Sequence, residues 1–576
     1  MTINAQLKTL VTCVSITCLC LWPFSTAVGA EEGDDEAKPS TNKKENYPPA
    51  ISFKKIINAE EAAKQLNMTQ LTVYSEANAP KAAKLEELEK KTAITQYGFT
   101  WTFDKAVPVG QFINGDWYVV GPVTVVMINP KPLFGNEITE GFIDKMEVAE
   151  SKYPGKQARN GSTLNPKILQ NDKGFVSYCG FDSRIPSGRY KADMFTPLPI
   201  AMKPGDCLLS SISRPNSEIT RFGSQQVDSI RAVAALSCVA EPQPADAFRP
   251  SYCDSANSKP YRARNLQRNL LLKLPRLKSM PESLAKHARL FERPWEDLAD
   301  FGFSAPLDNM PHYAQESTEI IGEATLLLQM DYSPEAKERL LVNFVQMGID
   351  FWGLTRAGRL WQAHGGLNQG RKWPIIFAGL MLADADMQSP KKAYPKARFH
   401  EDDQTAMCPY TYKDKVYERG ASGARAIFVG HSMWTDGATR GDWDAGKGPI
   451  DLFHPKDWPR QGSPGIASEG YRISNTSSAW VGQALAARLM HAEKIWNHEA
   501  YFAYVDRWMT EDDTALAQAK KDTGRTDVTA TKIGEWGRQG NVTGNPFIRE
   551  MWKLYRNNIP PGPNGEKTPP AEETWK

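Results

Sequence analysis

In the first half of the chain, apolar residues alternate with polar ones or form short blocks that Gly, Pro and Asn interrupt. Phe99–Phe103 alternates with a period of two, which is typical of a half-buried strand. Val107–Phe112 and Trp117–Ile128 are rich in β-branched and aromatic residues, and the turn Asn114-Gly-Asp116 between them predicts a β-hairpin. Because similar blocks continue to mid-chain, we expect an all-β domain over residues 95–262, sandwich-like or jelly-roll-like.

After the middle of the chain the apolar period becomes helical. A stripe of Ile, Ala and Leu predicts a helix that begins near Tyr313, and Pro334 fits the first turn of the next helix. Ile375–Leu382 is apolar all round, which predicts a helix buried on every side. Two more helices are expected over Trp480–Trp496 and Asn497–Met509. Helices in hairpin succession around a buried one favour an α/α toroid-like domain.

Both ends of the chain differ in composition from these regions. The first thirty residues combine Lys8, a short apolar core and small residues up to Ala30, which is typical of a secretory signal peptide. Short helices are expected at Ala59–Leu66 and Ala79–Lys91, and the Pro-rich tail from Pro560 is expected to be disordered. The expected order is a signal peptide at 1–30, a disordered leader with short helices at 31–94, the β domain at 95–262, the helical domain at 263–515, and a C-terminal extension with a disordered tail at 516–576.

These features predict an exported protein, secreted or periplasmic after cleavage near Ala30. No later stretch offers the roughly 20 apolar residues that a membrane anchor needs. A formal net charge of +2 lacks the basic excess of a nucleic-acid binder. Sixteen Trp and nineteen Tyr fit stacking on sugar rings, although ordinary core aromatics explain them as well. The sequence leaves the oligomeric state open.

Five cysteines remain after export, and four of them lie in the front half of the chain. In an exported protein this clustering favours one or two disulfides, with Cys238 and Cys253 as the nearest pair. Their spacing matches no zinc pattern. The five are Cys179, Cys207, Cys238, Cys253 and Cys408.

The densest group of chemically capable side chains is a glycine-rich stretch just before the buried helix. Arg371 can bind a carboxylate in bidentate fashion, Asn368 can donate to it, and His364 can act as a base near neutral pH. A purely structural loop remains an alternative. A phosphate-binding loop does not, because Arg and Lys stand where Lys and Ser or Thr are needed. Further substrate-binding candidates in this stretch are Trp361, Lys372 and Trp373.

Two other helix starts carry candidate acid–base groups. A Tyr at such a position can act as a general acid–base if a neighbouring cation lowers its pKa. The alternatives stay open: the two glutamates also suit a helix first turn, and the late Tyr also suits a half-buried side chain bonded to backbone. The candidates are His312, Tyr313, Glu316 and Glu319 at the first helix start, and Tyr471 and Arg472 at the second.

Weaker signals lie between the buried helix and the late Tyr. His431 is a lone histidine in a loop, for which a structural role is the more common one. Four residues resemble a calcium loop loosely, without its third acidic ligand or closing Glu, and no other cofactor is expected. These four are Asp442, Asp444, Gly446 and Asp451.

The order of signal peptide, β-rich module and helical hairpins resembles the secreted polysaccharide lyases built on an α/α toroid. The likeness covers Asn309–Trp496 and is architectural; many such lyases place the β-sandwich after the helices, whereas here it comes first. In those families an Asn, Arg or Gln neutralises the uronate, and a His/Tyr or Tyr/Tyr pair moves the protons. The residues that carry the resemblance are His364, Asn368, Arg371 and Tyr471, with His312 and Tyr313 in support.

The resemblance implies a lyase that cleaves an acidic, uronate-containing polysaccharide by β-elimination without a metal. Asn368 and Arg371 would bind the carboxylate, His364 or Tyr471 would remove the proton, and Tyr471 or Tyr313 would protonate the leaving oxygen. Two alternatives remain. One is a glycoside hydrolase whose carboxylates come from Glu316, Glu469 or the Asp residues of 436–451. The other is a non-catalytic carbohydrate-binding protein in which the β module binds the glycan.

Overall fold

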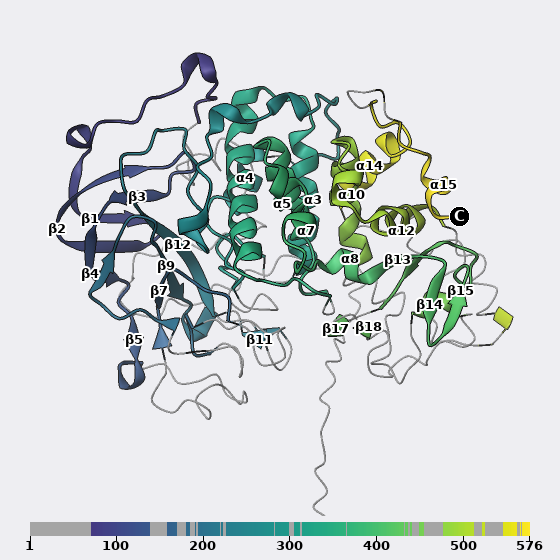
Figure 1. Cartoon of the computed structure of the whole chain (residues 1–576), viewed down its shortest axis with the longest axis horizontal. Coiled ribbons are helices and arrows are strands. Elements are labelled where there is room, and N and C mark those ends of the chain that lie inside the picture. Colours follow the sequence, from purple (N-terminus) through teal and green to yellow (C-terminus); the bar gives the residue numbers. More distant parts are fainter. Residues whose placement is uncertain are drawn as a thin grey trace, which may run out of the picture.

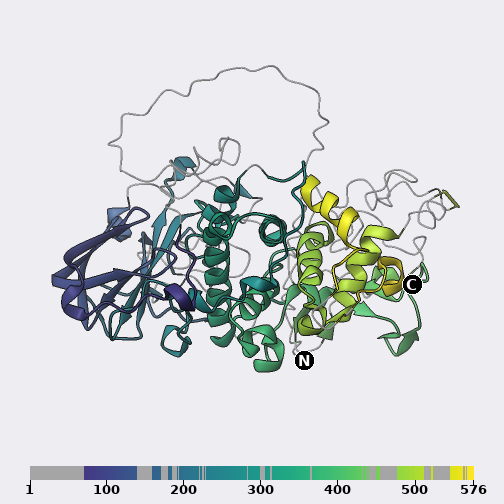
Figure 2. The ribbon, with the colours of Figure 1, turned by 90° about the horizontal axis from the view of Figure 1, so that it is seen from above.

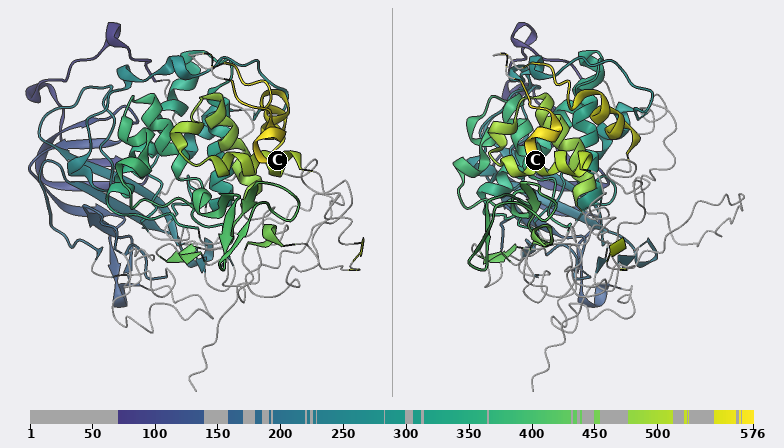
Figure 3. Two further views of the ribbon diagram at one scale, coloured as in Figure 1. Left: turned by 45° about the vertical axis from the view of Figure 1, so that its right-hand side comes forward. Right: turned by 90° about the vertical axis from the view of Figure 1, so that its right-hand side faces the viewer.

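The protein is described here from a computed structural model. β-strands form one end of the molecule, α3, α4 and α5 lie in the middle, and α10 and α12 lie at the other end (Figure 1). Figure 2 and the left view of Figure 3 show the same order, whereas the right view of Figure 3 looks along the molecule from the end with α10 and α12. The structure describes residues 71–138, 158–169, 180–184, 191, 194–218, 221–222, 226–227, 229–281, 283–298, 305–311, 314–363, 366–430, 433–435, 438–439, 449–453, 476–511, 521–522, 524, 545–561, 565 and 567–576.

A nearly closed, eight-stranded sheet forms the β-rich region. Seven strands follow one another in the order β7-β9-β12-β3-β2-β4-β8, and β1 pairs with β2. The strand β12 runs parallel to β3, while the other pairs are antiparallel. The strands are β1 Lys90–Gln96, β2 Phe99–Gln111, β3 Trp117–Val120, β4 Val123–Asn129, β7 Ser162–Leu164, β8 Ile200–Met202, β9 Cys207–Ser213 and β12 Ile230–Val239.

The predicted hairpin is confirmed. Val109 pairs with Val119 and Gln111 with Trp117, so the two strands β2 and β3 meet at the predicted Asn-Gly-Asp turn. Along β2, buried residues alternate with half-buried ones at Phe99–Phe103, as the period of two predicts. The run after Trp117 forms two strands, β3 and β4, that are separated at Gly121-Pro122.

The strand β12 is buried along its whole length because it separates two hydrophobic cores. Ala232, Ala234 and Leu236 face the interior of the sheet, while Val233 and Ala235 belong to the core shared with the helices. Successive side chains of a strand point to opposite faces, so each core receives alternate residues. The β-rich and helical regions therefore share a hydrophobic core, with β9 and β12 as the wall between them.

The region after Ser283 is mainly helical. The helices at Tyr313, Pro334 and Ile375 that the apolar pattern predicts are confirmed as α3, α4 and α5. Twelve α-helices lie among the described residues, and none of them is long and apolar enough to span a membrane. They are α2 Leu284–Leu290, α3 Ala314–Leu328, α4 Pro334–Arg356, α5 Lys372–Met381, α6 Ala385–Gln388, α7 Pro390–Ala393, α8 His400–Gln404, α10 Ser477–Leu489, α11 Glu493–Trp496, α12 Glu499–Thr510, α14 Pro546–Tyr555 and α15 Ala571–Trp575.

Short two-stranded sheets accompany these elements. β13 Thr405–Met407 and its partner β16 lie against α12, and they belong to the loop-rich stretch that the sequence shows after the buried helix. The remaining short strands are β5 Leu133–Phe134, β6 Ala158–Arg159, β10 Arg221–Phe222, β11 Gln226–Val227, β14 Tyr410–Tyr412, β15 Lys415–Tyr417, β16 Ala426–Phe428, β17 Met433–Thr435 and β18 Ala438–Thr439.

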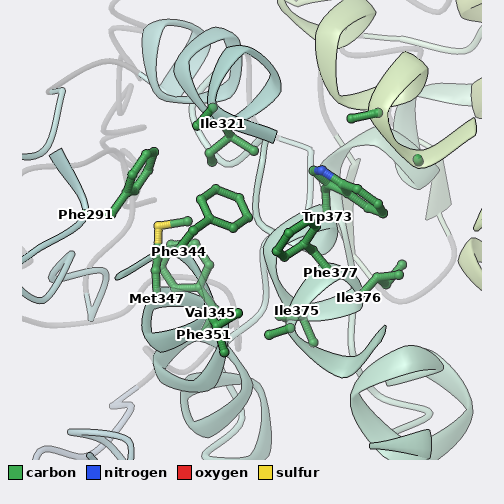
Figure 4. Packing of buried hydrophobic residues seen from close by; sticks show 14 of the residues in the cluster. Phe291, Ile321, Phe344, Val345, Met347, Phe351, Trp373, Ile375, Ile376 and Phe377 are labelled. Carbon is green, nitrogen blue, oxygen red and sulfur yellow. The ribbon is translucent and has the colours of Figure 1, made fainter. Parts of the chain in front are cut away.

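Helix α5 is buried at every position, as its uninterrupted apolar sequence predicts. Phe344 of α4 and Phe377 of α5 meet edge to face, with ring centroids 5.1 Å apart, and Ile321 of α3 lies close to them (Figure 4). Each such side chain contributes about 1.5–3 kcal/mol of burial free energy. The N-terminal end of α5 is consequently fixed in the centre of the helical region.

Two expectations at the ends of the chain are corrected. Ala79–Lys91 contains a three-residue 3-10 helix, Leu85–Glu87, and Lys90 already begins β1, so pairing with β2 overrides the helix propensity of this stretch. In the tail, Ala571–Trp575 forms α15, and the indole of Trp575 donates to Thr510 Oγ1 at 2.9 Å. The Pro-rich composition did not reveal this anchor. Residues 1–70, which include the signal peptide and Ala59–Leu66, lie outside the described residues.

The disulfide expectation is wrong for the four cysteines that the structure describes, because all are free and buried. Cys207 lies opposite Ser237 in the β9–β12 register, so Cys238 is its near neighbour. Their side chains nevertheless belong to different cores, one on each face of the wall. Cys253 belongs to the helical core, so the predicted Cys238–Cys253 pair is also divided by the wall. Cys179 lies outside the described residues.

Candidate active site

The glycine-rich loop, residues 361–371, connects the segment after α4 to the buried N-terminus of α5. Gly370 has a φ of +83°, and a Cβ at this position would lie 2.6 Å from Thr318 Oγ1. Only glycine avoids both the left-handed strain and this contact with α3. The glycine that the sequence places at this position therefore lets the loop pass directly against α3.

Three side chains of the loop region and the residues before it donate hydrogen bonds to Asp297. Its Oδ2 accepts from Trp361 Nε1 at 2.5 Å and from Arg371 Nε at 3.1 Å, and its carbonyl oxygen accepts from Arg359 Nε at 2.9 Å. Arg371 also donates to the carbonyl oxygen of Gln369 at 2.7 Å. One buried carboxylate thus fixes the loop at both its beginning and its end.

Lys372, the first residue of α5, has a second set of partners. Its Nζ donates to Asp402 Oδ2 at 2.6 Å and to the carbonyl oxygen of Trp496 at 2.7 Å. Burial raises the pKa of Asp402, but the charge and hydrogen bond of Lys372 outweigh it and hold that pKa below its ordinary value. Trp373 stacks on Trp496 and donates to Thr325 Oγ1 at 3.2 Å.

Glu401 is a fully buried carboxyl group whose hydrogen-bond donors among the described residues are amides and not cations. Its Oε1 accepts from the Gly370 amide at 2.6 Å and from Gln483 Nε2 at 2.9 Å, whereas its Oε2 finds no hydrogen-bond partner among the described residues. Burial raises its pKa. Burial therefore favours the neutral form of Glu401, which binds the loop through Oε1.

Three helix starts meet at the glycine-rich loop. Gly370 lies against Thr318 in the second turn of α3, and Trp480 Nε1 in the first turn of α10 donates to Gln369 Oε1 at 2.7 Å. The first turns of α3 and α10 also approach each other, since Gln315 Nε2 lies 3.5 Å from Ser478 Oγ. The N-terminal ends of α3, α5 and α10 consequently lie together, although they are far apart in sequence.

The predicted catalytic residues lie outside the described residues. His312 and Tyr313 directly precede α3, His364 lies within the glycine-rich loop, and Tyr471 lies six residues before α10. Their meeting at one site stays a prediction. Six further candidates also lie outside the described residues: Arg472, His431, Glu469, Asp442, Asp444 and Gly446.

The predicted substrate-binding residues of the loop are all described, and all are buried. Asn368 Nδ2 donates to the carbonyl oxygen of Gln362 at 2.9 Å, and its Oδ1 lies 3.4 Å from Arg359. Like Asn368, the other four candidates have partners within the protein. Direct contact with a substrate therefore stays a prediction for Trp361, Asn368, Arg371, Lys372 and Trp373, each of which is at most 2% exposed.

The carboxylates considered for a hydrolase have different environments. Glu316 is exposed on α3, whereas burial and the neighbouring charge of Glu323 raise the pKa of Glu319 to about 7. Glu323 itself binds His287 at 2.8 Å. Asp451, from the loose calcium pattern, is buried and binds Arg507 at 2.8 Å. Among the described residues, no group of three or more His, Cys, Asp or Glu is arranged to hold a metal ion.

The arrangement combines three helix N-termini with the buried ion pairs of Arg371 and Lys372. Helix N-termini present partial positive charge and favour anions, and three of them meet here. The buried ion pairs beneath the loop prevent its collapse, so side chains on it would be held in place.

Sequence reasoning missed the residues that hold the loop. Asp297 gives no local signal, because its partners are more than sixty positions away. The acids of α8 do form a visible run, Glu401-Asp-Asp403, but consecutive acids usually belong to a solvated surface. A run of acids within an otherwise weakly patterned stretch was the available signal.

Comparison of the chain with protein-family models, curated proteins and solved structures finds no match.

Proposed function

We propose that this protein is an exported lyase that cleaves a uronate-containing polysaccharide by β-elimination, on a helical region arranged as an α/α toroid. The observation that carries the proposal is the convergence of the first turns of α3 and α10 with the glycine-rich loop. Tyr313 directly precedes α3, His364 belongs to the loop, and Tyr471 lies six residues before α10. A β-elimination needs such groups on one substrate, together with stabilisation of an anionic intermediate.

In the proposed reaction His364 removes the proton next to the uronate carboxylate, and Tyr471 or Tyr313 protonates the leaving oxygen. The removed hydrogen becomes the proton of the imidazole, a carbon–carbon double bond forms, and the glycosidic carbon–oxygen bond breaks. His312 and Arg472 are expected beside these groups. The helix N-termini support the negative charge that develops on the carboxylate.

The proposal keeps the buried residues of the loop in their places beneath the substrate. Arg371 and Asn368 would neutralise the carboxylate from beneath, and Trp361, Lys372 and Trp373 would form the base of the site. The hydrogen bonds of Arg371 to Asp297 and Gln369 favour this fixed placement over a freely moving side chain. A fixed guanidinium stabilises charge without reorganisation during the reaction.

The test is incubation of the purified protein with alginate, ulvan, glucuronan and chondroitin. Elimination creates an unsaturated uronate, so ultraviolet absorbance should rise together with the number of reducing ends. His364→Ala should abolish the rise. His491→Asn, at the half-buried end of α10 where φ is +54°, is the matched control and should leave it unchanged, because Asn tolerates this backbone conformation.

A glycoside hydrolase is a second candidate, and one observation favours it. Glu319, whose pKa is about 7, and Glu323, whose pKa is lowered by His287 against the effect of burial, lie one turn apart on α3. A protonated and an ionised carboxyl group could divide the acid and base roles. Reducing ends that appear without absorbance, and that disappear in Glu319→Gln, would replace the lyase proposal with this one.

A further inference from the structure

Helices α2, α3 and α14 meet at a cluster of polar side chains: His287, Glu319, Glu323 and Asn545. Glu323 of α3 connects the three helices, because its Oε2 lies 2.8 Å from His287 Nε2 of α2 and its Oε1 accepts from Asn545 Nδ2 at 2.9 Å. Asn545 is the N-cap of α14, where its Oδ1 accepts from the amides of Phe547 and Ile548 at 3.0 and 3.2 Å. One carboxylate therefore links α2 to the first turn of α14.

Helix α14 depends on this cap and on its apolar face. It has 10 residues, and isolated helices of fewer than about 12–15 residues are marginal in water. It packs against α3 and α10, and its buried side chains are Phe547, Ile548, Met551 and Trp552. An N-cap side chain contributes about 1 kcal/mol to a helix, so a change of charge beside Asn545 should alter how firmly α14 is held.

Both ring nitrogens of His287 face acceptors. Its Nε2 lies against the Glu323 carboxylate, and its Nδ1 lies 3.2 Å from the carbonyl oxygen of Ser283. A neutral imidazole carries one N–H, so His287 donates to both oxygens only when it is doubly protonated. Burial raises the pKa of Glu323, but the hydrogen bond and charge of His287 outweigh burial and hold that pKa below its ordinary value. In its fully bonded form, the contact between α2 and α3 is therefore an ion pair.

Glu319 lies one turn before Glu323 on α3, so the two carboxyl groups are neighbours on one face of the helix. Burial, followed by the charge of Glu323, raises the pKa of Glu319 to about 7, although a hydrogen bond from Asn545 acts in the opposite direction. The Asn545 amide thus faces both glutamates. Once Glu319 ionises, two partly buried carboxylates meet at one amide, which burial and like charge both disfavour.

Two further charges act on the glutamates. Lys286 of α2 lowers the pKa of Glu323. Glu316 of α3 raises the pKa of Glu319. The other ionisable side chains of α2, α10 and α14 are Arg289, Arg488, Arg549, Glu550, Lys553 and Tyr555. Loss of protons from Glu319 and His287 thus makes the cluster more negative beside the existing negative charge of Glu316.

We propose that this cluster is a pH-sensitive latch between α3 and α14: the protons on Glu319 and His287 keep α14 docked, and their loss weakens the docking. Loss of a His287 proton removes one of its two hydrogen bonds and the cation opposite Glu323. Loss of the Glu319 proton places a second negative charge beside Asn545. Both changes act in the same direction, so together they weaken the docking more than either does alone. The latch is independent of the proposed function.

The pH range follows from the two glutamates. The pKa of Glu319 in the folded protein lies above its ordinary value of 4.5, so the stability that depends on its proton is complete below about pH 4.5 and is lost as the pH rises through about 7. The pKa of Glu323 is lowered, so its contribution is complete above its ordinary value of 4.5 and is lost as the pH falls through the folded pKa. Docking should therefore be firmest near about pH 5 and weaker at about pH 8.

The experiment measures hydrogen–deuterium exchange of the amides at 549–555 in the full chain at these two pH values, corrected for the intrinsic exchange rate. In the wild type the protection factor of α14 should fall by about tenfold or more from the lower to the higher pH, while that of α12 changes by less than about threefold. Glu319→Gln keeps the shape of the neutral acid and cannot ionise, so its fall should be smaller by about threefold or more. The control Glu86→Gln replaces an exposed carboxyl group of the 3-10 helix Leu85–Glu87 and should behave as the wild type does.

Asn545→Asp is a second variant, because it keeps the N-cap oxygen but replaces the amide donor with a carboxyl group. It should lower the protection of α14 by about tenfold more than in the wild type at the higher pH, and by less at the lower pH. Equal falls in the wild type and Glu319→Gln would overturn the latch, and so would wild-type protection of α14 in Asn545→Asp at both pH values. A fall in α12 as large as that in α14 would also overturn it, because the whole helical region would then be unfolding.

Discussion

At the junction of the sheet and the helices, the buried Arg249 binds two carboxylates. Beneath the glycine-rich loop, several carboxyl groups lie around the two cations Arg371 and Lys372. Arg249 donates to Asp116 at 2.6 Å and to both oxygens of Asp350, at 3.0 and 2.6 Å. The remaining oxygen of Asp116 accepts from Gln96 at 3.2 Å. All four carboxylate oxygens of this junction therefore have donors.

The network beneath the loop is less complete. Glu401 and Glu296 are buried, and each keeps one oxygen without a hydrogen-bond partner among the described residues. Burial raises the pKa of both carboxyl groups. Burial also raises the pKa of Asp350 at the junction, to about 6, so a raised pKa alone does not distinguish the two regions. The comparison teaches that they differ in hydrogen bonding: every carboxylate oxygen of the junction has a donor, whereas Glu401 and Glu296 each keep one oxygen without a partner among the described residues.

The largest effect is expected at the junction. Arg249→Ala would leave Asp116 and Asp350 buried without their cation, and should lower the free energy of unfolding by about 3–5 kcal/mol. Urea unfolding followed by tryptophan fluorescence measures it. The control is Lys576→Ala, which removes an exposed pair with Glu572 and should change stability by less than about 1 kcal/mol. Similar stabilities for the two variants would show that the junction does not hold the regions together.

Gly370→Ala should give the next largest effect, and it tests the close approach of the loop to α3. Alanine in the left-handed region costs about 1–2 kcal/mol. Gly423→Ala provides the matched control, because Gly423 has a φ of +87° and no atom within 4 Å of its added Cβ. Because of the contact with Thr318, Gly370→Ala should lower the free energy of unfolding by about 1–3 kcal/mol more than Gly423→Ala does. Equal unfolding free energies for the two variants would contradict the tight packing of the loop.

A smaller, pH-dependent effect should distinguish Glu401. Its folded pKa is raised above its ordinary value of 4.5, so between these values the native state binds more protons than the unfolded state. Stability from this group is complete below about pH 4.5 and is lost as pH rises through the folded pKa. Glu401→Gln imitates the neutral acid, so its stability relative to the wild type should rise with pH. A difference that stays constant across urea titrations from acid to alkaline pH would contradict a neutral Glu401.

The apolar pattern predicted the elements that local sequence determines. The hairpin at Asn114-Gly-Asp116 and the wholly buried helix at Ile375 follow from periods of two and from an uninterrupted apolar run. Aromatic content was ambiguous, and the structure places seven tryptophans among the largest fully buried side chains, where they form core. These include Trp361 and Trp373, which the sequence alone favoured as sugar contacts.

The site could be predicted only in part, because its supports come from distant segments. The sequence predicted candidates in the loop and before two helix starts, and the described part of the loop lies against α3 and α10. Whether the candidates themselves meet stays a prediction. It could not show that Arg371 meets Asp297 or that Lys372 meets Asp402, since a cation in a loop looks the same whether it faces a ligand or a buried acid. Side chains that pair in space but lie dozens of positions apart in the chain leave no periodic pattern in the sequence.

The smallest effect on stability is expected from a reducing agent. It tests whether a disulfide stabilises β9 and β12, which form the wall between the two cores. Cys207 and Cys238 lie on adjacent strands, but alternate side chains of a sheet point to opposite faces, so their sulfur atoms cannot meet. Because the four described thiols are free, reductant should leave the melting temperature unchanged, and thiol labelling of the unfolded protein should proceed without reduction. A melting temperature that falls by several degrees on reduction would instead show that a disulfide stabilises the wall. Arg249 and the shared apolar core would then contribute less to its stability than we infer.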